Sequence, residues 1–233
     1  MAKNNRGGRN KNIPAQTPTQ NTTTTSTTRS YKTMTDTMAQ QVRNEVDDRY
    51  TSDVRDAIKL YISKATDSQG YSMSQNLNYK LDNGIKLNAS EKFIDKYMQQ
   101  GMHPIGNDVV LTRACHDDIL KDLGIKDYTK MSDAQLQKAL VGGVYTTKSY
   151  NSFSYDDSKN PFLTGSQSGG REVIIKASTP STAKVVFGAK SQSEIITDKG
   201  TQYKINKVYY NGKTATPRNG ASKPQLVIEV EVV

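Results

Sequence analysis

The spacing of apolar residues changes near residue 108, and this change constrains the fold more than any other feature of the sequence. Before it, apolar residues recur every three or four positions, as in Val54, Ile58, Tyr61 and Ile62, which is the period of a helix with one buried face. After it, apolar and polar residues alternate as they do in strands. Helices followed by strands predict an α+β fold and disfavour alternating βαβ units.

Local signals place the individual elements. Helices are predicted from residue 54, over 71–81, between an N-cap at Ser90 and a stop at Gly101, and after a capping box at Ser132 and Gln135. Strands are predicted over 108–114, 144–154, 172–178, 184–188, 194–197, 202–210 and 225–233. Asn211-Gly212 has the composition of a tight hairpin turn.

The basic charge of the chain is concentrated at its N-terminus. Residues 1–35 contain six Lys or Arg and no Asp or Glu, so the net charge of +9 leaves only +3 for residues 36–233. This Thr/Asn-rich segment has too few apolar side chains to offset the entropy cost of ordering it. We therefore expect a disordered tail over 1–35 and a single domain over 36–233. The tail could bind nucleic acid or an acidic surface weakly, or serve only as a solubilising or packaging segment.

The sequence argues against several kinds of protein and site. The single cysteine, Cys115, rules out an intramolecular disulfide, and no apolar run approaches the roughly 18 residues that cross a membrane. The N-terminus has charge but no apolar core of a secretory signal peptide. Cys115 and His116 are adjacent and face opposite sides of a strand, so we interpret Cys115 as a packing residue. With His103 as the only other histidine, we expect no metal site.

A carboxylate and an amide lie two positions apart in Gln192-Ser193-Glu194. In an extended chain both side chains leave the same face, where they could grip a hydroxyl group and orient an incoming nucleophile. The alternative is an ordinary surface turn, since such short motifs are common. Glu229 and Glu231 form a second acidic pair, but they lie on the outward face of the last strand and we interpret them as solvated.

Two further segments carry candidate polar groups. Arg113 follows Val109 and Leu111 on an apolar strand face, and a guanidinium there needs an anionic partner, for which a phosphate is well suited. A strand-edge arginine paired with a carboxylate is the alternative. In Ser152-Phe153-Ser154 both hydroxyls point to one side of the chain and the ring to the other. An amphipathic strand without a special role would show the same pattern.

The order Arg113, Ser152-Phe153-Ser154 and Gln192-Ser193-Glu194 resembles the mono-ADP-ribosyltransferases of the Arg/Ser-Thr-Ser/Gln-x-Glu class. Within that class the chain is similar to C3-like exoenzymes and to VIP2-type and phage-borne domains. The resemblance covers residues 54–233, and its most specific match is Glu194-Ile195-Ile196 followed by residues 199–205. It implies N-terminal helices packed on two roughly perpendicular, mainly antiparallel β-sheets that enclose an NAD cleft.

The resemblance also implies a role for each site residue, with NAD as the substrate and no metal. Arg113 would hold the phosphates or the nicotinamide ribose, and the Ala114 backbone would meet the carboxamide. Ser152 would position Glu194, which would bond the 2′-hydroxyl of the nicotinamide ribose, while Gln192 would face the acceptor. The other implied NAD contacts are Ser154, Phe162 on a mobile flap over 156–170, and Ser74 and Asn78 beside the adenosine half.

The implied activity is transfer of ADP-ribose from NAD to a non-arginine acceptor on a host macromolecule, because Gln192 stands where arginine-modifying relatives carry a second carboxylate. Two alternatives stay open: DNA or RNA as the acceptor, and a catalytically inactive, virion-associated structural protein of the same fold. The absence of a signal peptide and the Thr/Asn-rich basic tail favour a phage effector that acts in the cytoplasm of a host bacterium, with or without carriage in the virion. We expect it to be a monomer. A secreted toxin effector is the alternative.

Overall fold

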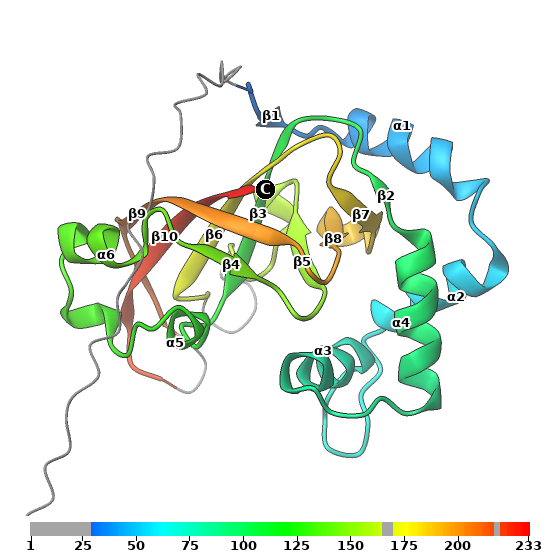
Figure 1. Cartoon of the computed structure of the whole chain (residues 1–233), viewed down its shortest axis with the longest axis horizontal. Coiled ribbons are helices and arrows are strands. Elements are labelled where there is room, and N and C mark those ends of the chain that lie inside the picture. The colour runs from blue at the N-terminus through cyan, green and yellow to red at the C-terminus, as the bar shows by residue number, and fades with distance from the viewer. Residues whose placement is uncertain (1–28, 165–169, 217–219) are drawn as a thin grey trace, which may run out of the picture.

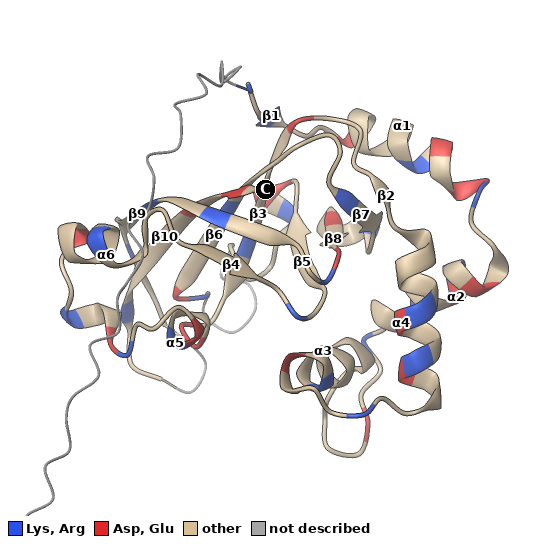
Figure 2. Cartoon of the chain, viewed as in Figure 1, with Lys and Arg blue, Asp and Glu red and all other residues tan. Residues whose placement is uncertain are grey.

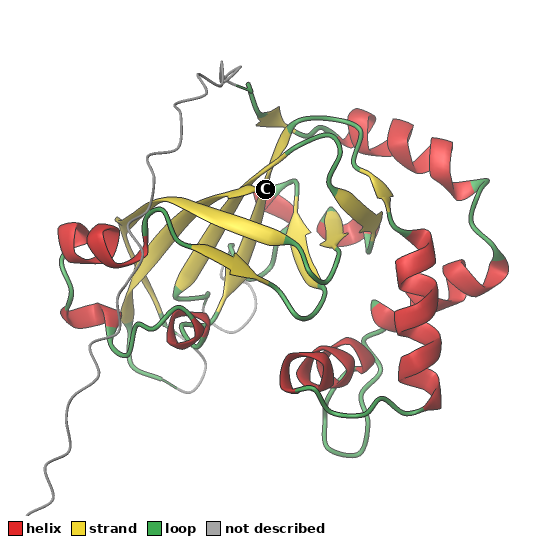
Figure 3. Ribbon diagram, in the orientation of Figure 1, coloured by secondary structure: helices red, strands yellow, loops and turns green. Residues whose placement is uncertain are grey.

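The computed structural model describes residues 29–164, 170–216 and 220–233 (Figures 1 and 3). The helices in these ranges are α1 (Asp36–Asp47), α2 (Ser52–Tyr61), α3 (Met73–Asn83), α4 (Ala89–Gly101), α5 (Ile119–Asp122) and α6 (Asp133–Leu140). The strands are β1 (Lys32–Thr33), β2 (His103–Pro104), β3 (Val109–Cys115), β4 (Val144–Thr146), β5 (Asn151–Ser154), β6 (Val173–Thr179), β7 (Lys184–Phe187), β8 (Glu194–Thr197), β9 (Gln202–Ala215) and β10 (Lys223–Val232). Within the described residues, four helices precede most of the strands, as predicted, but a short strand comes before the first helix and two further helices lie between β3 and β4. The α+β class is confirmed.

Reciprocal side-chain caps set the starts of α3, α4 and α6. The predicted capping box of Ser132 and Gln135 opens α6. The predicted cap of α4 at Ser90 is wrong, because Asn88 accepts from the Glu91 amide while the Glu91 carboxylate accepts from the Asn88 amide, and Ser90 lies inside the helix. Gly101 is the last residue of α4 and not a stop after it.

One mixed sheet runs through the molecule in the order β2-β7-β8-β5-β3-β6-β10-β9-β4, with β1 beside β3. Only β1–β3 and β6–β10 are parallel among the described strand pairs. The two expected sheets are parts of this one path, since β3 and β5 are joined through the single pair of Thr112 and Ser154. The predicted strand over 144–154 is divided into β4, which pairs with β9, and β5, which pairs with β8.

The Asn211-Gly212 turn prediction is wrong, because β9 continues through these residues to Ala215. The pairing with β10 shifts register between Pro224 and Leu226, and the extra residues on β9 include this dipeptide. Gly212 has a φ of 77°, which only glycine adopts readily, so the Asn-Gly signal produces a bulge within the strand.

Two hydrophobic clusters fix the site between them. Alternation along β7 and β8 sends Val186 and Ile196 toward the cluster with α2, α3 and α4, while Val185 and Ile195 join the cluster under α1, α5 and α6. Figure 1 shows α2–α4 on one side of the strands and α5 and α6 on the other. Asn78 of α3 donates to the Tyr150 carbonyl just before β5, so the junction of α3 and β5 lies between the two clusters.

Residues before the predicted domain boundary at residue 36 take part in the fold. β1 pairs in parallel with β3, and Thr35 caps α1. The Met34 side chain, which is 2% exposed, packs in the core and holds residues 32–35 in the fold. Residues 1–28 of the predicted tail lie outside the described ranges. Charges of both signs are spread over most elements in Figure 2. None of the helices described is long and apolar enough to cross a membrane.

Candidate active site

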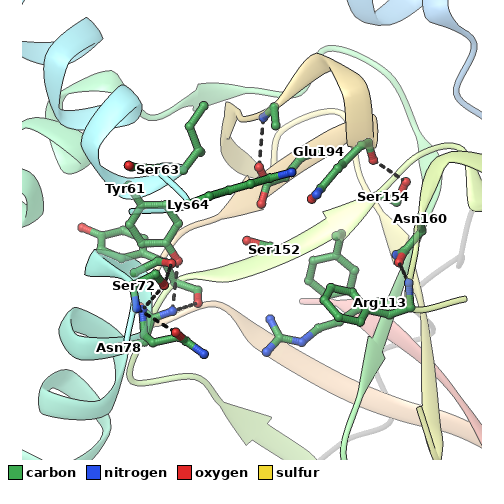
Figure 4. Close-up of a pocket in the computed structure, with 18 of the residues that line it drawn as sticks. Tyr61, Ser63, Lys64, Ser72, Asn78, Arg113, Ser152, Ser154, Asn160 and Glu194 are labelled. Carbon is green, nitrogen blue, oxygen red and sulfur yellow. Dashed lines mark hydrogen bonds between the residues drawn. The ribbon is translucent and has the colours of Figure 1, made fainter. Parts of the chain in front are cut away.

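The predicted site residues converge on one cavity of about 550 Å³, although they come from distant segments (Figure 4). Its walls are the end of α2 and the segment after it, α3, β3, β5, the segment after β5 and the turn before β8. All nine predicted residues line it: Ser74, Asn78, Arg113, Ala114, Ser152, Ser154, Phe162, Gln192 and Glu194. A volume of this size lies within the range of about 300–1,000 Å³ that is typical of small-molecule sites.

The Glu194 carboxylate is fixed by the main chain of the turn that precedes it. The Ala189 amide donates to Glu194 Oε2 at 2.9 Å, and the Gly188 amide donates to the Glu194 carbonyl at 2.9 Å. A Cβ at Gly188 would lie 2.3 Å from Oε2, so only glycine allows the carboxylate to sit against this turn. The acid is thus held in a single orientation at the wall of the cavity.

Gln192 and Glu194 both line the cavity, but the chain between them is not extended. Gln192 ends a 3-10 turn (Lys190–Gln192), and Ser193 adopts the left-handed conformation with a φ of 49° before β8 begins at Glu194. This conformation costs about 1–2 kcal/mol for a residue other than glycine. The extended geometry expected for Gln192-Ser193-Glu194 is therefore wrong, and a strained turn brings the two side chains to the same cavity.

The two serines of β5 differ in their surroundings. Ser154 is 2% exposed, and its hydroxyl oxygen lies 2.9 Å from the main-chain carbonyls of both Gln192 and Asp156, which share its single proton. We therefore interpret Ser154 as a residue that holds the Gln192 turn in place, and its contact with NAD stays a prediction. Ser152 lies nearer the centre of the cavity in Figure 4, between Glu194 and Arg113.

Arg113 forms no ion pair with any carboxylate of the described ranges. Figure 4 shows its guanidinium pointing into the cavity, so the alternative of a strand-edge ion pair does not hold. An accessible guanidinium without a carboxylate partner suits an anionic ligand. Burial raises the pKa of the neighbouring Cys115 thiol to about 11, and the charge of Arg113 opposes this shift. The raised pKa supports the interpretation of Cys115 as a packing residue.

Two tyrosines that the sequence analysis did not propose as site residues, Tyr61 and Tyr150, complete the α3 side of the cavity. The Asn78 side-chain amide donates to the Tyr61 hydroxyl at 2.9 Å and to the Tyr150 carbonyl at 3.0 Å. The Asn78 Oδ1 atom is buried without a hydrogen-bond partner among the described residues, so it can accept from a ligand. Burial raises the pKa of Tyr61 to about 12, which keeps its hydroxyl protonated near neutral pH.

The segment after β5 is also organised by side chains that sequence reasoning missed. Asn160 Oδ1 accepts from the Phe162 amide at 3.0 Å, and the Arg171 guanidinium lies 4.4 Å from the centre of the Phe162 ring. These contacts hold the ring at the wall of the cavity. Part of the predicted flap, residues 165–169, lies outside the described ranges, so its mobility stays a prediction.

The other candidate groups lie apart from this cavity. Glu229 and Glu231 accept hydrogen bonds from the hydroxyls of Tyr209 and Tyr31, each at 3.0 Å. Neither residue lines the cavity, and both are half-buried, so the predicted solvated face is only partly exposed. Within the described ranges no group of His, Cys, Asp and Glu side chains could hold a metal ion.

The arrangement suits one type of chemistry. A cation without a carboxylate partner can bind phosphate, a buried amide oxygen can accept from a hydroxyl or amino group, and a fixed carboxylate can stabilise a cation that develops beside it. Loss of a leaving group from a sugar carbon builds such an oxocarbenium-like cation. The cavity therefore fits a phosphorylated glycoside whose glycosidic bond breaks next to Glu194.

Comparison with known proteins agrees with this geometry. In structure the chain is similar to a C3 ADP-ribosyltransferase of Clostridium botulinum (18% identity, TM-score 0.60, 88% of this chain and 99% of that one). It is similar to the C3 exoenzyme of Clostridium limosum (16%, TM-score 0.60, 88% and 98%), and to the ADP-ribosylating toxin of a binary enterotoxin of C. perfringens, solved with NADH (15%, TM-score 0.60, 87% and 50%). A search of curated proteins finds no match. The model of the ADP-ribosyltransferase exoenzyme family matches residues 26–232, and the chain belongs to this family of NAD-dependent ADP-ribosyltransferases.

Proposed function

We propose that the protein transfers one ADP-ribose unit from NAD to an acceptor other than arginine on a host macromolecule. The observation that carries this proposal is the meeting of Arg113, Glu194 and Gln192 in one cavity, with Glu194 held by the Ala189 amide. Membership of the family supplies the reaction class. The nature of the acceptor rests on the side chain at position 192.

The cleavage step assigns each group a task. Arg113 binds the pyrophosphate, and Asn78 Oδ1 accepts from a hydroxyl or amino group of the adenosine half, since its amide protons are already used by Tyr61 and Tyr150. Glu194 holds the 2′-hydroxyl of the nicotinamide ribose beside the reacting C1′. The bond between C1′ and the pyridinium nitrogen breaks, and its electron pair leaves with neutral nicotinamide. One preorganised interaction of this kind contributes roughly 3–4 kcal/mol to the rate.

Acceptor attack completes the reaction. The acceptor nucleophile forms a new bond to C1′ and loses its proton to solvent or to a neighbouring base. An arginine acceptor needs a negative group to hold its cation, and the neutral amide of Gln192 does not supply one. Gln192 can instead donate to and accept from a neutral amide or hydroxyl, which favours asparagine, glutamine or threonine side chains.

Mass spectrometry of a bacterial lysate tests both the reaction and the acceptor. The lysate is incubated with NAD and either the protein or its Glu194→Gln variant, and protein and nucleic-acid pools are analysed separately for the addition of one ADP-ribose unit. We expect the addition only with the unchanged protein, in the protein pool, on a side chain other than arginine. Addition in the nucleic-acid pool would replace the proposed acceptor, and modified arginine would overturn the inference from Gln192.

The inactive alternative has its own test, which is calorimetric titration with NAD. A structural protein that only retains the fold has no need to bind the dinucleotide, so absence of binding would contradict the proposed reaction. We propose the cytoplasm of a bacterial host as the place of action, on the strength of composition alone, and the lysate experiment is designed accordingly.

A further inference from the structure

Arg43 on α1 is a buried cation whose placement the proposed reaction has not yet explained. The residue is 9% exposed and has no carboxylate within ion-pair distance in the described part of the chain. Burial lowers the pKa of Arg43, while nearby phenolic and carboxylate groups, Glu194 among them, oppose this shift. Burying a charge is unfavourable unless specific partners compensate for it.

The partners of Arg43 lie on the turn that carries Glu194. Its Nη1 and Nη2 atoms donate to the Gly188 carbonyl at 3.4 and 3.3 Å, and its guanidinium lies 4.7 Å from the centre of the Phe187 ring. The His103 ring stacks on Phe187 as well, with 5.7 Å between centroids and 19° between planes. Phe187, the residue before the turn, is therefore held by the His103 ring and by the Arg43 guanidinium.

The two ends of one peptide unit connect Arg43 to Glu194. The Gly188 carbonyl, which accepts from Arg43, and the Ala189 amide, which donates to Glu194 Oε2 at 2.9 Å, belong to the same peptide bond. A cation at the carbonyl oxygen polarises the peptide and strengthens its N–H as a donor, as in other hydrogen-bond chains. The same contact prevents the peptide plane from rotating away from the carboxylate.

From this arrangement we infer that Arg43 is a positioning residue, which aligns the Glu194 carboxylate through the peptide between Gly188 and Ala189. The inference deepens the proposed function, because alignment of Glu194 matters to rate only if Glu194 acts in the cleavage of NAD. Arg43 does not line the cavity and makes no contact with the substrate space. Its loss should therefore change turnover and leave NAD affinity unaltered.

The first measurement is independent of turnover and uses the Ala189 amide resonance. In the full chain labelled with ¹⁵N, we expect the Ala189 proton to be shifted downfield by its hydrogen bond to the carboxylate. Arg43→Met, which keeps an unbranched apolar stem beside Phe187 but removes the cation, should move this resonance upfield. Arg43→Lys should restore at least half of the difference, because an ammonium group can still reach the carbonyl.

The second measurement separates kcat from binding. We expect Arg43→Met to lower the kcat of nicotinamide release about tenfold, with a change of less than about twofold in the Kd for NAD, and Arg43→Lys to recover most of the rate. Arg49→Met, at an exposed arginine that follows the same helix, is the matched control and should change neither quantity. Arg43→Gln, a neutral donor, replaces the methionine variant if that variant fails to fold.

The outcomes distinguish the two proposals. An Ala189 resonance in Arg43→Met that matches that of the unchanged protein would overturn the positioning role, whatever the activity. A loss that lysine does not rescue in either measurement would show that Arg43 only packs against its neighbours, and would also overturn the positioning role. If the resonance moves as expected but no form of the protein releases nicotinamide, the alignment stands and the proposed reaction fails.

Discussion

Gly188→Ala places a methyl group against the carboxylate on which the proposed chemistry depends. The backbone at Gly188 lies outside the left-handed region, so alanine is compatible with its conformation. The added Cβ would lie 2.3 Å from Glu194 Oε2 and 2.7 Å from its Cδ, whereas ordinary contact begins at 3.4 Å. The carboxylate must therefore retreat by about 1 Å, and a displacement of this size can lower a rate about 100-fold.

Steady-state release of nicotinamide from NAD is the assay, with calorimetric titration of NAD alongside it. We expect kcat to fall about 100-fold while the affinity for NAD changes much less, because the phosphate-binding Arg113 is untouched. Gly101→Ala is the matched control, since its Cβ would lie 2.8 Å from Val54 Cγ1, far from the cavity. That variant should lose stability and keep its rate per folded molecule. A rate for Gly188→Ala within threefold of the unchanged protein would refute the reasoning about Glu194.

Three further predictions concern other parts of the molecule. Arg113→Lys should raise the Kd for NAD about tenfold by calorimetry, because an ammonium group cannot bind phosphate through two parallel hydrogen bonds; an unchanged Kd would contradict the assigned contact. The Cys115 thiol, with its pKa raised by burial to about 11, should react with iodoacetamide appreciably only as the pH approaches that value, and rapid labelling at pH 7.5 in mass spectra would contradict this. Lys80→Met leaves the Glu91 carboxylate, which is 3% exposed and 2.7 Å from the Lys80 ammonium, without its cation. The free energy of unfolding in urea should fall by about 3 kcal/mol, and a loss below about 1 kcal/mol would argue against a buried pair.

The elements that the sequence predicted well are those with local signals. The capping box at Ser132 and the alternation in β10 depend on residues a few positions apart, and both appear in the structure. The helix start at Asn88 was missed because Ser90 carried a competing cap signal, and only the reciprocal bond with Glu91 decides between them. The turn predicted at Asn211-Gly212 is absent, since pairing with β10 continues past it; Gly212 alone has the positive φ that such turns use.

The site shows the same division between local and distant information. Arg113, Gln192 and Glu194 could be proposed from residue types in order along the chain, together with the resemblance to a family. Arg43 could not, because it lies 145 positions from Gly188 and interacts with a main-chain carbonyl that any residue would offer. The hydrogen bond between the Ser154 hydroxyl and the Gln192 carbonyl could not be predicted for the same reason.

The most direct test of the central claim is the rate of nicotinamide release from NAD by the unchanged protein and by Glu194→Gln. The substitution keeps the size of the side chain and removes the negative charge beside the breaking bond. We predict a loss of about 10²–10³-fold in kcat, with the fold and the Kd for NAD preserved. Equal rates for the two proteins would show that the cavity does not use this carboxylate to break the glycosidic bond.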